Sequence, residues 1–343
     1  MKRLIVIFLF FPLWVSAQIG GRNVYDFLRL SPSARLSAIG GENVARIDED
    51  ANFAFRNPAL LSDSASGNLN LNIYNYVSDI SFGSAQYAHH LDKIGTIHGG
   101  IQYVSYGKFT QADEYGNITG NYRSGDVAFV TGISRAYKQF RYGVNWKLIN
   151  SNLANYSSFG TAFDIGGAYS TKDQLFNAGI SFQNIGTQLS KYAPLGQKQP
   201  LPFQIQAGIS YKPQYMPMRL YLTGIQLQDP ILIYQDPDKP LDKDFNGNPI
   251  AAKKRVGDKI MGHFVLGTEF YLGRNLRLRA GYNHLRRIEL GSANRAGLSG
   301  FSFGFGLKIS RFRFDYGFVR YAAGMNTHQF GVSTNLRSFK KKS

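Results

Sequence analysis

Apolar and polar residues alternate through about fourteen segments of about ten residues between residue 69 and the C-terminus. The segment 301–309, FSFGFGLKI, shows the pattern clearly, because Phe301, Phe303 and Phe305 stand at every second position with small residues between them. Side chains of a β-strand point alternately to its two faces, and a tilted strand needs about 9 to 11 residues to cross a bilayer. The pattern therefore predicts an all-β fold: a transmembrane antiparallel β-barrel of about 14 strands, apolar outside and polar inside.

The connectors between these strands alternate between short and long. The strands are expected at residues 69–76, 80–89, 94–105, 126–135, 139–150, 159–170, 175–184, 203–212, 217–227, 262–272, 275–284, 299–309, 312–321 and 327–336. Connectors from an even to an odd strand are short, whereas most others are long, at 106–125, 151–158, 185–202, 228–261 and 285–298. Outer-membrane barrels have short periplasmic turns and longer extracellular loops. The chain is therefore expected to have an even strand number, with both ends of the barrel wall at the periplasmic side.

Charged and amide side chains keep to one face of each predicted strand. A Lys or Arg that faces lipid at the bilayer centre costs about 2 to 4 kcal/mol, so this face is predicted to line the lumen. In residues 217–227 neither face is consistently apolar, which predicts a bulge or a shifted strand boundary. The predicted lumen residues are Arg141, Asn145, Lys147, Asp164, Gln204, Gln206, Glu269, Arg277, Arg279, Asn283, Lys308, Arg313 and Asp315.

The N-terminal residues have the composition of an export signal. Lys2 and Arg3 precede the apolar run LIVIFLFFPLWV, and a small-residue cleavage site ends at Ala17. Residues 1–17 are therefore predicted to be a secretory signal peptide, with the mature chain beginning at Gln18. The alternative is a retained membrane anchor, but the run is short for a bilayer span and no stop-transfer charges follow it.

Residues 18–68 lack the strand alternation. Apolar spacing over residues 36–44 predicts a short helix, and Pro58 is expected to end a helix. The lumen of a barrel of about fourteen strands is too wide for its own side chains to fill, so this segment is predicted to plug it. The alternative is a disordered periplasmic extension, which the apolar content of YDFLRL and LSAIGG disfavours. The predicted division is a signal peptide at 1–17, a plug at 18–68, a barrel at 69–338 and a basic tail at 339–343.

The chain contains no cysteine and carries a formal net charge of +17. The missing cysteines exclude a disulfide framework, so the closed strand ladder is expected to stabilise the fold. A positive charge of this size attracts either nucleic acid or an anionic lipid surface. The basic residues are scattered through strands and loops, which favours outer-membrane lipid as the partner and predicts no nucleic-acid binding.

The candidate catalytic and metal-binding groups are sparse. His89, His90 and His98 surround one predicted turn, yet no cysteine and no clear carboxylate partner accompanies them. No GxSxG motif places a nucleophile. We therefore expect no enzymatic activity, no catalytic residue, no cofactor and no metal.

The longest connector, 228–261, is the candidate partner-binding loop. Asp242, Asp244, Asn246 and Gly247 imitate the start of a calcium loop, but Lys253 stands where the bidentate Glu belongs, which favours an Asx-rich turn. The connector combines the apolar ILIY near 231 with acidic and basic clusters. Long loops of barrels carry function, so a partner is expected to bind within this range.

The run VARIDEDANFAFRNPALL, residues 44–61, contains the predicted plug motif, formed by Asp50, Asn57, Pro58 and Ala59. It resembles the hatch of the fatty-acid-transporter-like outer-membrane barrels. The preceding run, GGRNVYDFLRLSPSARLSAIGG, resembles the start of the PorQ-like proteins of the type IX secretion system, which are related to PorV. This resemblance implies a cell-surface role beside PorU and PorV, in which the barrel anchors a PorZ-like surface protein. It implies no catalytic residue.

These observations leave three hypotheses for the function. The first is a non-enzymatic outer-membrane anchor of the type IX cargo-attachment complex, with the N-terminal segment plugging the barrel. The second is an outer-membrane transporter for hydrophobic small molecules, which would need an apolar channel that the polar predicted interior does not favour. The third is a general porin, which a plug would contradict.

Overall fold

The computed structural model describes residues 23–76, 79–193, 196–230, 232, 256–290, 297–322 and 325–339. The predicted signal peptide, the calcium-like residues 242–253, most of the connector 228–261 and residues 340–343 of the basic tail lie outside these ranges.

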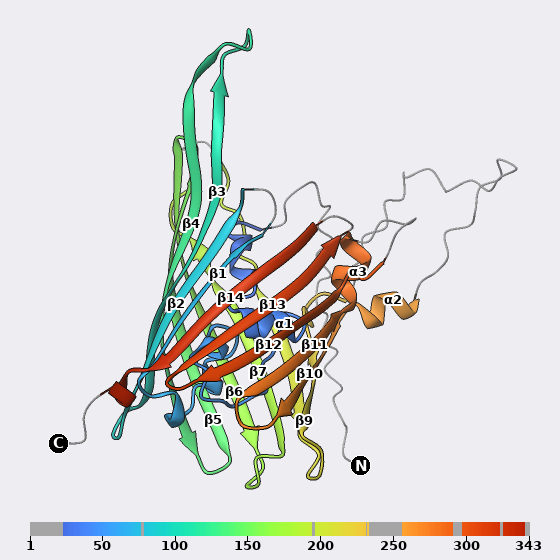
Figure 1. Cartoon of the computed structure of the whole chain (residues 1–343). Coiled ribbons are helices and arrows are strands. Elements are labelled where there is room, and N and C mark those ends of the chain that lie inside the picture. The colour runs from blue at the N-terminus through green and yellow to red at the C-terminus, as the bar shows by residue number, and fades with distance from the viewer. Residues whose placement is uncertain are drawn as a thin grey trace, which may run out of the picture.

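The described residues form a closed antiparallel β-barrel (Figure 1). Each strand pairs with its neighbours in sequence, and β1 closes the barrel on β14 with Asn68 opposite Asn335 and Tyr74 opposite Gln329. This arrangement confirms the predicted fold class and strand number. The strands are β1 (Asn68–Asn75), β2 (Ser81–Leu91), β3 (Gly95–Ala112), β4 (Ile118–Tyr137), β5 (Phe140–Leu153), β6 (Tyr156–Ser170), β7 (Phe176–Gln188), β8 (Gln204–Tyr211), β9 (Met218–Gly224), β10 (Phe264–Leu272), β11 (Leu276–Asn283), β12 (Phe301–Ile309), β13 (Phe312–Ala322) and β14 (Met325–Asn335).

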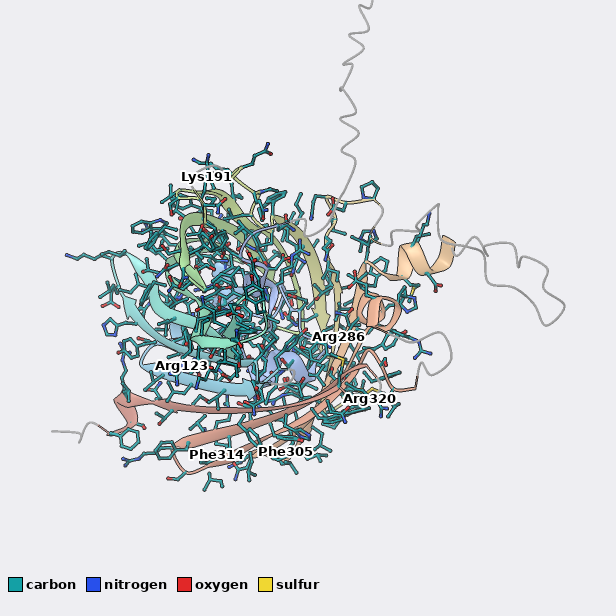
Figure 2. The ribbon with its side chains drawn as sticks, turned by 90° about the horizontal axis from the view of Figure 1, so that it is seen from above. Arg123, Lys191, Arg286, Phe305, Phe314 and Arg320 are labelled. Atoms are coloured by element: carbon teal, nitrogen blue, oxygen red, sulfur yellow. The ribbon has the colours of Figure 1, made fainter. Side chains whose placement is uncertain are left out.

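The two faces of the wall differ as the alternation predicts. In β5, Asn145 and Lys147 are buried, whereas Val144, Trp146 and Leu148 are 42%, 45% and 44% exposed. Seen from above, the side chains of Phe305 and Phe314 point away from the barrel (Figure 2). The apolar side chains thus cover the outside, where only a hydrocarbon solvent makes their exposure favourable. Among the described helices, none is both long and apolar enough to span a membrane.

Two expectations about the strands need correction. Residues 106–125 are not a long loop: β3 continues to Ala112 and β4 begins at Ile118, with Lys108 paired to Arg123 and Gln111 to Gly120. Cross-strand hydrogen bonds continue past the barrel rim, although both faces of the hairpin are exposed there and apolar and polar residues no longer alternate. For residues 217–227 the sequence predicted either a bulge or a shifted strand boundary. Strand β9 shows no register shift against β8 or β10, so there is no bulge; it ends at Gly224, which confirms the shifted boundary.

The short helical elements at the N-terminus lie inside the barrel (Figure 1). They are η1 (Asp26–Arg29), α1 (Ala34–Ala38), η2 (Ala51–Phe55), η3 (Pro58–Leu60) and η4 (Asp63–Ala65). We refer to residues 23–67 as the plug. Helix α1 contacts β11 to β14, and η3 contacts β4 to β6 on the opposite wall. Three further short elements lie outside the plug: α2 (Val256–Met261), α3 (His284–Leu290) and η5 (Leu336–Phe339).

The expected helix over residues 36–44 is misplaced. Helix α1 begins earlier, with Ser33 as its N-cap accepting a hydrogen bond from the Leu36 amide, and it ends before Gly40 and Gly41, whose φ angles are +104° and +96°. Positive φ is incompatible with a continuing right-handed helix. Pro58 lies two residues after Arg56, the C-cap of η2, as expected of a proline that stops a helix, and it also begins the next 3₁₀ turn, because the first helical position needs no amide hydrogen.

Candidate functional site

The Asn57-Pro58-Ala59 step fixes the plug to the wall. The Asn57 Nδ2 group donates to the carbonyl of Val44 at 2.7 Å and lies 3.3 and 3.2 Å from the carbonyls of Gly167 and Ile180, while its Oδ1 accepts from the Ala59 amide at 3.0 Å. The side chain is fully buried. A single amide thus connects two plug segments to strands β6 and β7.

Glycine pairs across neighbouring strands make this close approach possible. Gly143 of β5 lies opposite Gly166 of β6; a Cβ atom on Gly143 would be 2.7 Å from the Pro58 carbonyl carbon, and one on Gly166 would overlap Asn57 Oδ1. The plug backbone contacts the wall in the same way at three more pairs. These are Gly179 with Gly208, Gly267 with Gly281, and Gly304 with Gly317.

A buried network of charges joins the plug to the opposite wall. Arg35, on α1, is 2% exposed and lies 2.9 Å from Asp48, 3.4 Å from Asp50 and 3.2 Å from Glu269 of β10. Its guanidinium also lies over the Phe53 ring. Buried charges are stable only when they are paired, so this network binds the plug firmly to β10. It continues from Glu269 to Arg279 and from there to Asp315, at 2.9 and 2.6 Å.

The predicted motif residue Asp50 has two roles in this network. Its side chain caps η2 by accepting from the Asn52 amide at 3.0 Å, and it faces Arg35. Burial raises the pKa of Asp50, an effect that Arg35 only partly offsets. Burial also disfavours the charge of Asp48, but Arg35 and Arg46 hold the pKa of Asp48 well below its usual value.

A second polar cluster lies on the other side of the lumen. Lys147 of β5 is 2.9 Å from Asp164 of β6. The Asn145 Nδ2 group donates to Asp164, and its Oδ1 accepts from the His98 ring at 2.8 Å. His98 is therefore a buried member of a hydrogen-bonded network. In the part of the chain that the structure describes, no three His, Cys, Asp or Glu side chains are grouped to hold a metal.

An apolar cluster fills the lumen at the end where the connectors are long, here named the long-loop end. Phe27 and Leu28 of η1 pack there against inward-facing residues of the wall, including Val104 and Ile149. Sequence reasoning missed these inward apolar positions, because it assigned the lumen face from charges and this half of the wall carries few. The two polar clusters lie farther down the lumen, toward the opposite end of the barrel, where the connectors are short and which we name the short-turn end.

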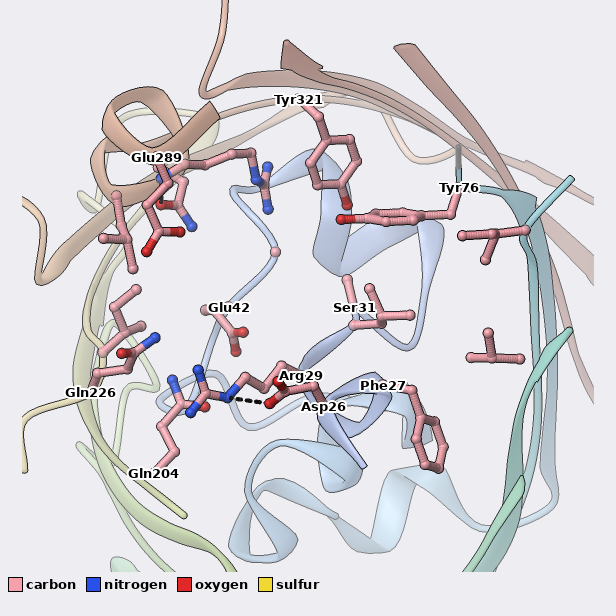
Figure 3. Close-up of a pocket in the computed structure, with 18 of the residues that line it drawn as sticks. Asp26, Phe27, Arg29, Ser31, Glu42, Tyr76, Gln204, Gln226, Glu289 and Tyr321 are labelled. Carbon is pink, nitrogen blue, oxygen red and sulfur yellow. Dashed lines mark hydrogen bonds and ion pairs between the residues drawn. The ribbon is translucent and has the colours of Figure 1, made fainter. Parts of the chain in front are cut away.

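A cavity of about 400 Å³, here named the vestibule, opens above the plug at the long-loop end (Figure 3). One side is apolar or aromatic, with Phe27, Ile80 and Val104, and Tyr76 packs edge-to-face on Tyr321 at 4.8 Å between ring centroids. The remaining lining residues are Asp26, Arg29, Leu30, Ser31, Gly41, Glu42, Tyr106, Gln204, Ile225, Gln226, Asn283, Leu285, Arg286 and Glu289.

Arg56 holds the vestibule floor in place. Its guanidinium donates to the carbonyls of Leu28, Arg29 and Leu30 at 3.1, 2.6 and 3.0 Å, and its Nε lies 3.0 Å from Glu42. Burial raises the pKa of Glu42, although Arg56 opposes the shift. One buried arginine thus fixes the η1 turn that separates the vestibule from the lumen below.

The cavities at the two ends of the barrel share no lining residue. Cavities of about 250 and 340 Å³ open at the short-turn end around Glu49 and Ile47. Between them and the vestibule lie Arg35, Asn57, Asp164 and Glu269, each at most 2% exposed. The plug therefore fills the middle of the lumen with paired polar groups.

The comparisons with known proteins agree with a barrel of this type. No protein-family model matches the chain, and no curated protein matches it. The toluene transporter TodX of Pseudomonas putida is 13% identical, with a TM-score of 0.51 over 89% of this chain and 96% of that one. A TodX deletion mutant scores 0.50 at 14% identity, and a Pseudomonas aeruginosa FadL homologue scores 0.49 at 8% identity, both over 89% of this chain and 98% of theirs.

At these identities the likeness shows the fold alone. The chain shares its barrel fold with TodX, and its own fourteen described strands close around the plug. TodX is described as a toluene transporter and, in its mutant form, as a monoaromatic hydrocarbon channel.

Proposed function

We propose that this barrel is a non-enzymatic outer-membrane anchor, a PorQ-like component of the type IX secretion system that holds a PorZ-like protein at the cell surface beside PorU and PorV. The observation that supports this function is the fixed plug. Ion pairs, the Asn57 hydrogen bonds and four glycine pairs hold it against the wall on several sides. A lumen closed in this way favours a protein that acts through its surface.

The hairpin of β3 and β4 is the described element best suited to bind a surface partner. It rises well above the rest of the barrel (Figure 1). Its tip exposes Tyr115 at 89% and Ile118 at 74%, and Phe109 stacks on Tyr122 at 5.2 Å between ring centroids. Exposed aromatic residues on a rigid support are typical of interface anchors. The predicted loop 228–261 remains a second candidate, since it leaves the same end of the barrel.

The test compares two exposed tyrosines at opposite ends of the barrel. Tyr115 lies at the hairpin tip, and Tyr215, which is 91% exposed, lies in the short turn between β8 and β9. The double variant Y115S/I118S should release the partner from the cell surface and from the purified barrel. The control Y215S should retain it. Full retention by the hairpin variant would remove the hairpin from the proposal, and full retention after deletion of the whole barrel gene would refute anchoring.

A transporter for hydrophobic small molecules is the second candidate, and two observations favour it. The fold is shared with a toluene transporter, and the vestibule has an apolar side formed by residues such as Phe27 and Val104. Passage would require the η1 turn to move away from Arg56. Uptake of a hydrophobic probe by proteoliposomes decides between the functions: the anchor predicts no uptake above empty liposomes, and the transporter predicts uptake that saturates.

A further inference from the structure

The outer face of the barrel carries an apolar hollow of about 640 Å³ over strands β8 to β12. It arises from one row of cross-strand neighbours, in which Leu220, Thr268, Ala280 and Phe303 lie side by side. Thr268 and Ala280 are short, so they form a floor between the two large flanking side chains. Leu266 and Phe301 continue the walls in the next row.

The hollow lies in the lipid-facing belt and crosses it from Tyr211, at the short-turn end of β8, to Leu298, at the long-loop end of the wall. Leu220, Leu266 and Phe303 are 43%, 44% and 42% exposed, and the lining is almost wholly apolar. Phe301 begins β12 just below the long-loop rim, and Leu298 of the turn that precedes it also lines the hollow. Because the long loops are extracellular in such barrels, the end of the hollow at Leu298 and Phe301 faces the outer leaflet.

Basic side chains gather at the rim of the hollow. The Tyr282 hydroxyl, from the wall of the hollow, lies 2.7 Å from His284, which begins α3 and whose Nε2 is 3.2 Å from Asp258. Arg287 follows one turn later on α3 and donates to the Gly297 carbonyl at 3.4 Å, next to Leu298. Lys259 lies on α2, beside Asp258. Among the described residues of α2 and α3, the cations Lys259, Arg286 and Arg287 outnumber the carboxylates Asp258 and Glu289. Arg286 and Glu289 line the vestibule, and His284 engages Asp258.

We propose that this hollow is a binding site for an acyl chain of an anionic glycolipid of the outer leaflet, whose phosphate lies against Arg287 and Lys259. The apolar floor fits a hydrocarbon chain, and the basic rim supplies the charge complementarity that an anionic headgroup needs. A transmembrane segment of a partner would match the apolar hollow but would leave the rim cations unpaired.

The test uses the full-length protein in detergent, stripped of lipid and titrated with diphosphoryl lipid A while bound lipid is counted by native mass spectrometry. T268F fills the hollow, and T131F makes the same change at an outward position on β4, on another part of the wall. T268F should weaken binding by about tenfold, since it excludes at least two methylenes of the chain. T131F should bind like the wild type. A280L fills the same floor more gently if T268F does not insert.

Two variants of the basic rim test the contact with the lipid headgroup. R287Q and K259Q should each weaken lipid A binding by about fivefold and leave a neutral phosphatidylcholine unaffected. Equal lipid A binding by T268F, A280L and the wild type would overturn the proposal. So would the loss of a co-purifying protein or of a dimer, rather than of lipid, when the hollow is filled.

Discussion

Replacing Asn57 tests the fixed plug directly, because this side chain connects two segments of the plug to each other and to the barrel wall. In N57A the Val44 carbonyl loses its donor at 2.7 Å and the Ala59 amide loses its acceptor at 3.0 Å. Each buried backbone group left without a partner costs about 1 to 3 kcal/mol, so the free energy of unfolding should fall by about 3 kcal/mol. N57D should cost more, because its carboxylate cannot donate and would face three carbonyl oxygens.

The assay is urea unfolding of the protein in lipid vesicles. Trp146 is 45% exposed on the outer face, so its fluorescence reports insertion of the barrel. The exposed Asn152 at the end of β5 provides the control, and N152A should unfold like the wild type. Single-channel current gives a second readout, since a loosened plug should conduct intermittently. If N57A and N57D unfold at the same urea concentration as the wild type and carry no single-channel current, the plug does not depend on Asn57 as proposed.

Three further predictions concern the same contacts. G166A places a Cβ against the plug and should lose about 1 to 3 kcal/mol of stability. In G167A the nearest neighbour of the new Cβ is the Ile180 side chain at 3.5 Å, so this variant should unfold within about 0.5 kcal/mol of the wild type in the same urea assay. R35Q removes the cation that Asp48, Asp50 and Glu269 share; Arg46 still pairs with Asp48 and Arg279 with Glu269, but the buried Asp50 loses its ion pair. This variant should lose about 3 kcal/mol, with an increased channel current as the second sign. Burial raises the pKa of Glu42, so its ionisation destabilises the folded state as the pH rises above the usual carboxylate range. Relative to the wild type, E42Q should gain stability as the pH rises above about 4, and a difference in urea midpoint that stays constant with pH would contradict the role assigned to burial.

The wall of the barrel was largely predictable from the sequence. The expected strand at residues 312–321 corresponds to β13 at Phe312–Ala322, and the remaining strands follow in the predicted order. The reason is local: lipid on one side and a filled lumen on the other impose a period of two on every strand. The same rule misjudged residues 106–125, because beyond the membrane no lipid imposes an alternation, yet the two strands still pair.

The interior was predictable only in outline. Charged residues such as Asp164 and Glu269 do face the lumen, as expected, but their partners were not foreseen. Arg35 and Glu269 are separated by 234 positions in the chain, and no local pattern relates them. The glycine pairs do leave a signal, since Gly143 and Gly166 both occupy inward positions of adjacent strands. That signal has meaning only when the strand register is known.

The sequence by itself determined that this chain is a membrane barrel of about fourteen strands with a distinct N-terminal segment, because the alternation of lipid-facing and lumen-facing residues is written within each strand. Only the tertiary structure decided where that segment lies and what holds it. Closing the barrel brings β10 beside α1 and β6 beside Asn57, and it sets Thr268 and Ala280 in one row between Leu220 and Phe303. The fixed plug and the lipid-facing hollow both follow from neighbours across strands, which the order of residues along the chain does not specify.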